Sequence, residues 1–263
     1  MLDPTTYETI RIEKRANGVA IATLNRPDKL NAVDARMHTE LSTIARDFEL
    51  DPDLKVLVIT GAGRAFCAGG DFSGGRAVGG RVTDLWQEAR QIVDHLLECT
   101  KPVISAVNGY AMGLGATVAL LCDVVVAARS AVFADTHVRM GIGAGDGGQV
   151  IWPFLMGVNR AKYYLMTGDR LNAEEAERMG LVNFVVDDAQ LMSRALEIAD
   201  RLAAGPALAI SASKVPINQW LRSVSAQVLP LSLEMERRTF GSEDAKEAGQ
   251  AFAEKRQPHF KGK

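Results

Sequence analysis

The sequence predicts an α/β protein with a β/α core, a parallel sheet covered on both faces, and a helical C-terminal extension. Apolar segments at 55–61, 102–109 and 123–128 have the length of buried strands, and helical periodicity fills the intervals between them. Strands that alternate with helices indicate right-handed crossovers and a parallel sheet. From residue 159 onward the periodicity is mostly helical.

A β-hairpin and a helix are expected ahead of these strands. Alternating segments flank Ala16-Asn17-Gly18, and an Asn-Gly pair between two such segments favours a tight hairpin turn. Asp34 is the expected N-cap of the first helix, because a short acidic side chain accepts a hydrogen bond from the first turn. The apolar face of that helix consists of Met37, Leu41, Ile44 and Phe48.

The rest of the core continues this alternation. A helix over 85–96 precedes the second buried strand, and GLGATVALLCD (113–123) predicts a helix before the third. A short apolar segment at 182–186 and an amphipathic helix over 191–202 follow.

The C-terminal part is predicted to consist of helices only. After Pro206 we expect helices with breaks at Pro216 and Pro230, because proline lacks the amide hydrogen that a helix interior needs. We therefore divide the chain into a β/α core, residues 1–200, and a C-terminal helical region, residues 201–263.

Composition and charge exclude several classes of protein. The 263 residues are 47% hydrophobic, enough for a sizeable core, and the net charge of −2 argues against a dedicated nucleic-acid binder. Cys67, Cys99 and Cys122 have no metal-ligand spacing, which disfavours a zinc site or a disulfide framework. The first 15 residues lack a signal-peptide pattern, and no segment has the roughly 20 apolar residues of a membrane span. We expect a cytoplasmic protein with no membrane contact.

Two strand-to-helix turns are rich in glycine. GRAFCAGGD (Gly63–Asp71) follows the first buried strand, and NGYAMGLGA (Asn108–Ala116) follows the second. Backbone N–H groups at the start of a helix have no partner within the helix, so two converging turns of this kind form an oxyanion hole. The alternative is that the glycines serve only tight turns and close packing.

Five blocks of this sequence occur together in one known family. They are LNRPDKLNAV, GRAFCAGGD, KPVISAVNGYAMGLG, MTGDRLNAEEAERMGLV and AFAEKRQPHF, in register from about Ile12 to Phe260. The set resembles the crotonase superfamily, the enoyl-CoA hydratase/isomerase family. This resemblance implies a spiral of ββα units assembled as a homotrimer or a dimer of trimers, with residues 201–263 as the trimerisation region. It also implies an acyl-CoA thioester substrate, with no metal and no cofactor beyond coenzyme A as part of that substrate.

The resemblance also assigns binding residues. The backbone N–H groups of Gly70 and Leu114 match the donors that grip the thioester carbonyl and stabilise an enolate. Leu114 stands where many relatives have glycine, which narrows the pocket but keeps the backbone donor.

Four further residues match positions that contact coenzyme A. Ala68 lies in the first glycine-rich block, and Arg64 occupies the basic position just ahead of it. Lys29 stands one residue after the usual lysine of its block, and Lys255 resembles a C-terminal lysine that reaches a neighbouring subunit's ligand. As an alternative, each of these three charged side chains is a solvated surface charge.

The sequence departs from the family at the two glutamates that hold water in hydratases. Thr117 and His137 occupy their positions. Threonine is a poor base at neutral pH, whereas histidine transfers protons near neutrality. Asp146, in the GAGDGG turn, is expected to orient the ring of His137 and fix its tautomer. The alternative is that Asp146 caps the helix that begins near Gly147.

The segment GIGAGDGGQVIWPFLMGVNRAKYYLMTG is similar to the matching block of the 6-oxocamphor hydrolase branch of the superfamily. That branch cleaves a carbon–carbon bond of a cyclic β-diketone by adding water, without coenzyme A. The block NGYAMGLG keeps the thioester-binding form, which favours an acyl-CoA substrate for this chain.

Three functions remain open on the sequence alone. The leading hypothesis is an acyl-CoA enzyme that uses His137 and Asp146 for β-oxo hydrolysis or isomerisation. The others are enoyl-CoA hydration with His137 as base and acyl-CoA binding without catalysis. The glycine-rich segment 73–80 is expected to form a loop beside the acyl group, and Asp84 and Glu88 are candidates for reaching the acyl pocket.

Overall fold

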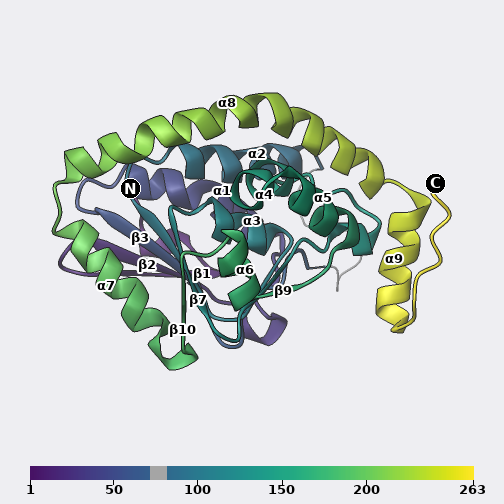
Figure 1. Cartoon of the computed structure of the whole chain (residues 1–263), viewed down its shortest axis with the longest axis horizontal. Coiled ribbons are helices and arrows are strands. Elements are labelled where there is room, and N and C mark those ends of the chain that lie inside the picture. The colour runs from purple at the N-terminus through teal and green to yellow at the C-terminus, as the bar shows by residue number, and fades with distance from the viewer. Residues whose placement is uncertain (72–81) are drawn as a thin grey trace.

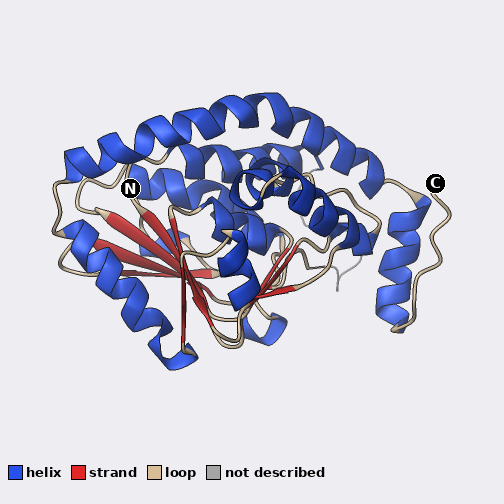
Figure 2. Cartoon of the chain, in the orientation of Figure 1, coloured by secondary structure: helices blue, strands red, loops and turns tan. Residues whose placement is uncertain are grey.

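The structure, a computed structural model, describes residues 1–71 and 82–263, without the side chains of residues 82–84. The loop expected at 73–80 and the side chain of Asp84 lie outside the described residues. The expected α/β architecture is confirmed, with two sheets of mixed direction and an α-helical C-terminal region (Figures 1 and 2).

The larger sheet has six strands in the order β1-β2-β3-β5-β7-β10. Their bounds are β1 (Ile10–Lys14), β2 (Val19–Leu24), β3 (Val56–Gly61), β5 (Val103–Val107), β7 (Val124–Ala128) and β10 (Phe184–Val186). The hairpin predicted at Asn17-Gly18 joins β1 and β2, which pair antiparallel, and all other neighbours in this sheet are parallel.

The smaller sheet has four strands, β4 (Ala65–Cys67), β6 (Tyr110–Met112), β8 (Val132–Ala134) and β9 (Leu171–Asn172). The first three are parallel to one another, and β9 is antiparallel to β8. Strands β4, β6 and β8 each follow a strand of the larger sheet after a short turn, so the chain alternates between the sheets in ββα units. The carboxyl ends of β4, β6 and β8 therefore lie at the same edge of the smaller sheet.

Nine α-helices occur in the described ranges. They are α1 (Ala35–Glu49), α2 (Val82–Glu98), α3 (Leu114–Leu121), α4 (Gly148–Met156), α5 (Val158–Thr167), α6 (Ala173–Met179), α7 (Leu191–Ala203), α8 (Ala207–Phe240) and α9 (Glu243–Glu254). Asp34 caps α1 as predicted, because its Oδ1 accepts a hydrogen bond of 2.9 Å from the N–H of Met37.

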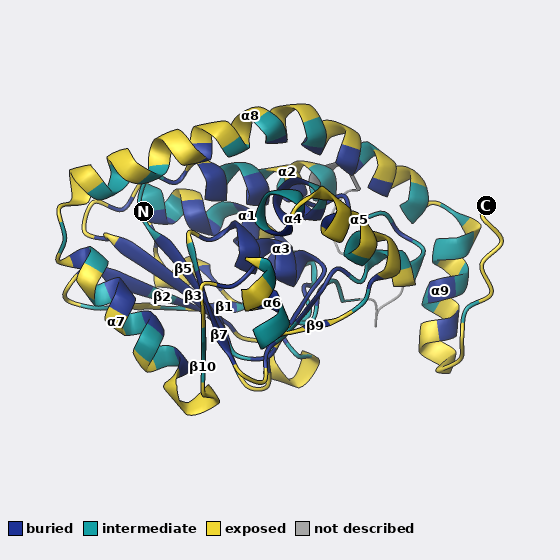
Figure 3. Cartoon of the chain, viewed as in Figure 1, coloured by how far each residue is buried: buried dark blue, intermediate teal, exposed yellow. Residues whose placement is uncertain are grey.

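Helices cover both faces of the larger sheet, as Figure 3 shows by burial. Helix α7 packs its apolar stripe, including Ala195 and Ile198, on one face. On the other face lies the main core, which contains the fully buried Phe48, Phe66 and Trp152. Burying a side chain of this size stabilises the fold by about 1.5–3 kcal/mol relative to leaving it exposed.

The expected breaks at Pro216 and Pro230 are wrong, because α8 continues through both prolines for 34 residues. Both prolines are exposed, and α8 arches across the molecule with its convex side outward (Figure 1). A helix that curves in this direction accommodates a proline ring on its outer side, so the lost hydrogen bonds bend the helix without ending it. In the described parts of the chain, no helix has an apolar stretch long enough to cross a membrane, and this includes the 34-residue α8.

Gly115 places the first turn of α3 directly on β4. A β-carbon at residue 115 would lie 2.5 Å from the carbonyl oxygen and 2.6 Å from the Cβ of Cys67, closer than non-bonded atoms approach. Any side chain here therefore forces α3 away from the small sheet.

We predict that Gly115→Ala lowers the free energy of unfolding by about 1–3 kcal/mol, the usual cost of overpacking a buried site. Gly249→Ala in α9 is the matched control, because nothing lies within 4 Å of the added carbon, and alanine favours a helix by about 0.5–1 kcal/mol. Urea unfolding of both variants tests this, and equal shifts in the two would contradict the proposed packing.

Candidate functional site

A cavity of about 530 Å³ opens at the carboxyl ends of β4, β6 and β8. The turns that follow these strands contribute Gly70, Leu114 and His137 to its lining, and α1, α2, α8 and α9 complete the walls. Ligands of α/β proteins commonly bind at the carboxyl ends of parallel strands, where several loops converge.

The two glycine-rich turns converge as predicted. Strands β4 and β6 pair in parallel, and a β-carbon on Gly69 would lie 3.0 Å from the carbonyl oxygen of Met112. Leu114 is the first residue of α3, so its N–H has no acceptor within the helix. Among the described backbone hydrogen bonds, none uses the N–H of Gly70. Two free backbone donors thus lie at the same end of the cavity.

His137 lies beside these donors. It begins the 3-10 turn η3 (His137–Met140), which follows β8, and β8 pairs with β6. The backbone of Gly113 has a φ of +52°, and a β-carbon there would lie 3.3 Å from Cε1 of His137. The imidazole therefore packs on Gly113, the residue immediately before the Leu114 donor.

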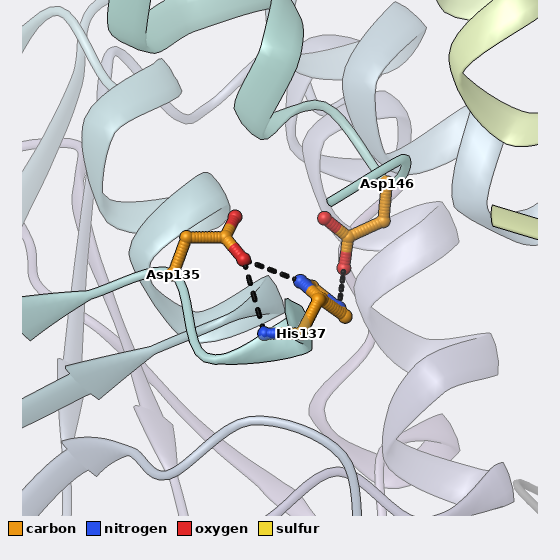
Figure 4. A group of neighbouring side chains, drawn as sticks. All are labelled: Asp135, His137 and Asp146. Carbon is orange, nitrogen blue, oxygen red and sulfur yellow. Dashed lines mark hydrogen bonds and ion pairs between the residues drawn. The ribbon is translucent and has the colours of Figure 1, made fainter. Parts of the chain in front are cut away.

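Carboxylates face both nitrogens of the His137 ring (Figure 4). Nδ1 lies 2.7 Å from Oδ1 of Asp135, which also accepts a 3.2 Å hydrogen bond from the backbone N–H of His137. Nε2 lies 3.3 Å from Oδ2 of Asp146 and 3.9 Å from Oε1 of Glu236. Thr117 donates to the other oxygen of Asp146 at 3.2 Å.

Glycines in the GAGDGG turn make room for this group. A β-carbon on Gly145 would lie 2.4 Å from Cβ of Glu236, and one on Gly148 would lie 2.5 Å from Oδ2 of Asp135. These glycines let the turn approach two carboxyl groups, that of Asp135 directly after β8 and that of Glu236 on α8. Their function is steric, and they explain why a lone aspartate is surrounded by glycine here.

The mutual contacts set the charge of each group. Burial lowers the pKa of His137, but the charges of Asp146 and Asp135 outweigh it and raise the pKa well above 6.5. Burial raises the pKa of Asp146, but the charge and hydrogen bond of His137 outweigh this and lower it. Burial and then the charge of Asp146 raise the pKa of Glu236 to about 8. At neutral pH the group contains an imidazolium, an ionised Asp146 and a protonated Glu236.

Five residues predicted for the site line the cavity, and three do not. Those that line it are Ala68, Gly70, Leu114, His137 and Asp146. The side chains of Lys29, Arg64 and Lys255 are exposed and are absent from the lining.

The capping alternative for Asp146 is wrong. The N-cap of α4 is Gly147, which has no side chain, and Asp146 contacts His137 and Thr117. The partner on Nδ1 is Asp135, and its place two residues before His137 is the local sequence signal that marks it. Glu236 gave no local signal, because α8 brings it to the site from a distant part of the chain.

Metal binding and thiol chemistry are the alternatives that the residues of this site raise. Asp135, His137 and Asp146 offer three ligand atoms within 4.8 Å of one another, the spacing of a metal site. Both ring nitrogens already face carboxylates at hydrogen-bond or ion-pair distance, so a metal would have to displace a proton between them. Burial raises the pKa of the Cys67 thiol to about 12, which leaves it unreactive at neutral pH.

Comparison with known proteins identifies the family of this chain. Residues 14–263 match the family model described as enoyl-CoA hydratase/isomerase. The chain belongs to the enoyl-CoA hydratase/isomerase family.

Relatives within the enoyl-CoA hydratase/isomerase family differ in their named reactions. A Rhodobacter capsulatus protein named "Probable enoyl-CoA hydratase" is 38% identical, over 98% of this chain and all of its own length. The 1,2-epoxyphenylacetyl-CoA isomerase of Escherichia coli is 38% identical over 94% of this chain and 96% of its own. The crystal structure of an enoyl-CoA hydratase from Mycobacterium avium subsp. paratuberculosis superposes with a TM-score of 0.89 at 28% identity, covering 97% of this chain and 99% of that one.

The raised pKa of Glu236 predicts a pH-dependent stability in this family member. The native state keeps a proton that the unfolded chain releases above about pH 4.5, so stability falls as pH rises from about 4.5 to 8. The titration of Glu236 lowers the free energy of unfolding by at most about 1.4 kcal/mol per pH unit. His137 also lowers the free energy of unfolding as pH rises above 6.5, because its pKa in the native state is raised too.

We predict that Glu236→Gln removes the part of this slope between pH 5 and 6.5, as measured by urea unfolding at a series of pH values. Glu234→Gln is the control on the same helix, because the pKa of Glu234 is lowered by Arg237 and Arg238 and the residue stays ionised across this range. Parallel stability curves for wild type and Glu236→Gln would contradict the prediction.

Proposed function

We propose that this chain hydrolyses the bond between the α- and β-carbons of a β-oxoacyl-CoA thioester, through a thioester enolate. The observation that carries the proposal is the position of Asp146 and Glu236. Both carboxyl groups face the ring of His137, which packs on Gly113 next to the free N–H of Leu114.

The two backbone donors are assigned to the thioester oxygen. In this proposal the N–H groups of Gly70 and Leu114 hydrogen-bond that oxygen, and the bonds strengthen as it gains negative charge in the enolate. Each preorganised donor of this kind contributes about 10²–10³ in rate. Arg139, Arg170 and Arg256 also line the cavity. Arg139 pairs with Asp169, and Arg256 pairs with Glu247 and Glu254, so Arg170 is the candidate to meet an anionic ligand such as coenzyme A.

The group around His137 is assigned to the α-carbon. Asp146 is ionised and Glu236 is protonated at neutral pH, so the pair includes a proton acceptor and a proton donor. Two carboxyl groups whose pKa values are driven apart are typical of acid and base roles. Glu236 gives its proton to the α-carbon after bond cleavage. At an intact α-carbon, Asp146 removes a proton and Glu236 supplies the one that replaces it.

This assignment gives His137 a positioning role in place of the base role expected from the sequence. Both of its ring nitrogens face carboxylates, so the ring holds positive charge beside Asp146 and keeps that carboxylate ionised. Asp135 fixes the ring from the other side. Thr117 and His137 occupy the two positions at which the resemblance places hydratase glutamates, which argues against hydration by paired glutamates.

Isomerisation is the second candidate, and one observation favours it. The Escherichia coli relative at 38% identity is named as an isomerase. A proton shift next to a thioester uses the same enolate and the same Asp146, and it requires no water.

Assembly as a homotrimer or a dimer of trimers belongs to the same proposal. The family resemblance supports it, and so do large apolar side chains exposed on α8, such as Leu208, Ile217, Trp220 and Leu231.

The enolate step is tested by exchange of the α-proton in deuterium oxide. We expect wild type to deuterate the α-carbon of a saturated acyl-CoA, and Asp146→Asn to do so about 10²–10⁴-fold more slowly, the usual contribution of a general base. Mass spectrometry of the thioester measures both rates, and β-oxoacyl-CoA thioesters of different length are then screened for cleavage.

Asp200→Asn serves as the control. Asp200 lies on α7, pairs with Arg15 and does not line the cavity. If Asp146→Asn exchanges the α-proton as fast as wild type, Asp146 is not the base. Absence of exchange with every thioester would overturn the proposed function as a whole.

A further inference from the structure

A second carboxylate–histidine pair lies on the helical wall of the same cavity. Nδ1 of His38, on α1, lies 2.6 Å from Oε2 of Glu88, on α2. The other oxygen of Glu88 accepts a 2.7 Å hydrogen bond from the hydroxyl of Thr39. The carboxylate is thus held by two neighbours on α1, and it in turn fixes the orientation of the imidazole.

The open nitrogen distinguishes His38 from His137. His38 is 4% exposed and lines the cavity, yet Nε2 has no hydrogen-bond partner among the described residues. When Nδ1–H donates to a carboxylate, the neutral ring carries a lone pair on Nε2. An imidazole held in this tautomer by a carboxylate is the arrangement that general bases use in hydrolytic enzymes.

The surroundings of His38 imply a polar partner inside the pocket. Val33, Leu85, Trp86 and Ala89, which also line the cavity, are apolar or aromatic, and none of them is hydrogen-bonded to Nε2. On the same wall, the buried indole N–H of Trp86 has no acceptor in the described part of the chain. Buried polar groups without partners are unfavourable, so water or an oxygen-bearing acyl group is expected beside this wall.

One cavity contains both histidine groups. Burial raises the pKa of Glu88, but hydrogen bonds from His38 and Thr39 outweigh it and lower the pKa, so the carboxylate is ionised at neutral pH and accepts the Nδ1–H of His38. His38 and His137 both line this cavity.

We propose that His38, oriented by Glu88, is the general base for the water that attacks the β-carbonyl carbon. This inference rests on the proposed β-oxoacyl-CoA hydrolysis and identifies the residue that makes it a hydrolysis. It assigns water activation to the wall formed by α1 and α2, and enolate protonation to Asp146, His137 and Glu236.

Nε2 of His38 takes a proton from water while the water oxygen bonds to the β-carbon and the β-carbonyl becomes an alkoxide. The alkoxide reforms its carbonyl as the α–β carbon–carbon bond breaks, and that electron pair becomes the thioester enolate. Glu236 protonates the α-carbon, His38 returns its proton to Glu236 through solvent, and the products are a carboxylic acid and a shorter acyl-CoA.

The test separates hydrolysis from enolate chemistry in one variant. His38→Gln keeps an N–H for Glu88 but removes the basic nitrogen, so we expect β-oxoacyl-CoA cleavage to fall about 10²–10⁴-fold. Exchange of the α-proton of a saturated acyl-CoA in deuterium oxide is expected to stay within about twofold of wild type. A residue with a merely structural role would not separate the two rates.

His95→Gln is the matched control. His95 also lies between α1 and α2, and its Nδ1 bonds to the carbonyl oxygen of Ser42, but it does not line the cavity. This variant is expected to keep both rates. If His38→Gln fails to fold, as judged by circular dichroism, Glu88→Gln replaces it, with an expected 10–100-fold loss of cleavage and unchanged exchange.

Each outcome decides the inference. Loss of cleavage with intact exchange supports His38 as the base for water. Cleavage at the wild-type rate in His38→Gln, or equal loss of cleavage and exchange, overturns that role while leaving the enolate mechanism in place. Absence of exchange in wild type would instead overturn the proposed function, and the two failures are therefore distinguishable.

Discussion

The parallel pairing of β4, β6 and β8 is the constraint on which the site depends. Parallel strands end on the same side, so the turns after them meet at one edge of the small sheet. That edge brings together the free backbone donors of Gly70 and Leu114 and the ring of His137. The larger sheet and its helices keep these three strands in register, because each unit begins with a strand buried in the six-stranded sheet.

Two histidines in one cavity illustrate how surroundings decide chemistry. His137 lies between two carboxylates and carries positive charge, which suits it to hold Asp146 in its ionised form. His38 has a single carboxylate partner and an open nitrogen. The residue type is the same in both cases, but the number of acidic neighbours differs. A protein interior can therefore separate electrostatic support from proton abstraction without using different side chains.

Much of the fold followed from local patterns. Asn17-Gly18, Asp34 and the short apolar segments predicted the hairpin, the first helix and the buried strands, because these signals act over a few residues. Local glycine patterns marked the two turns, whereas the choice of Gly70 and Leu114 within them came from the family resemblance. Glu236 depends on how α8 crosses the molecule, and the continuous path of α8 through Pro216 depends on its curvature. Both are tertiary effects with no counterpart in local sequence.

Each segment of the cavity belongs to a separate structural unit with its own anchor in the hydrophobic core. The free backbone donors follow β4 and β6, whereas the buried group around His137 follows β8 and includes one member from α8. Evolution can therefore exchange the residues of one unit while the others continue to hold the ligand. A common scaffold can in this way acquire a new reaction by altering a single turn, at little risk to binding or folding.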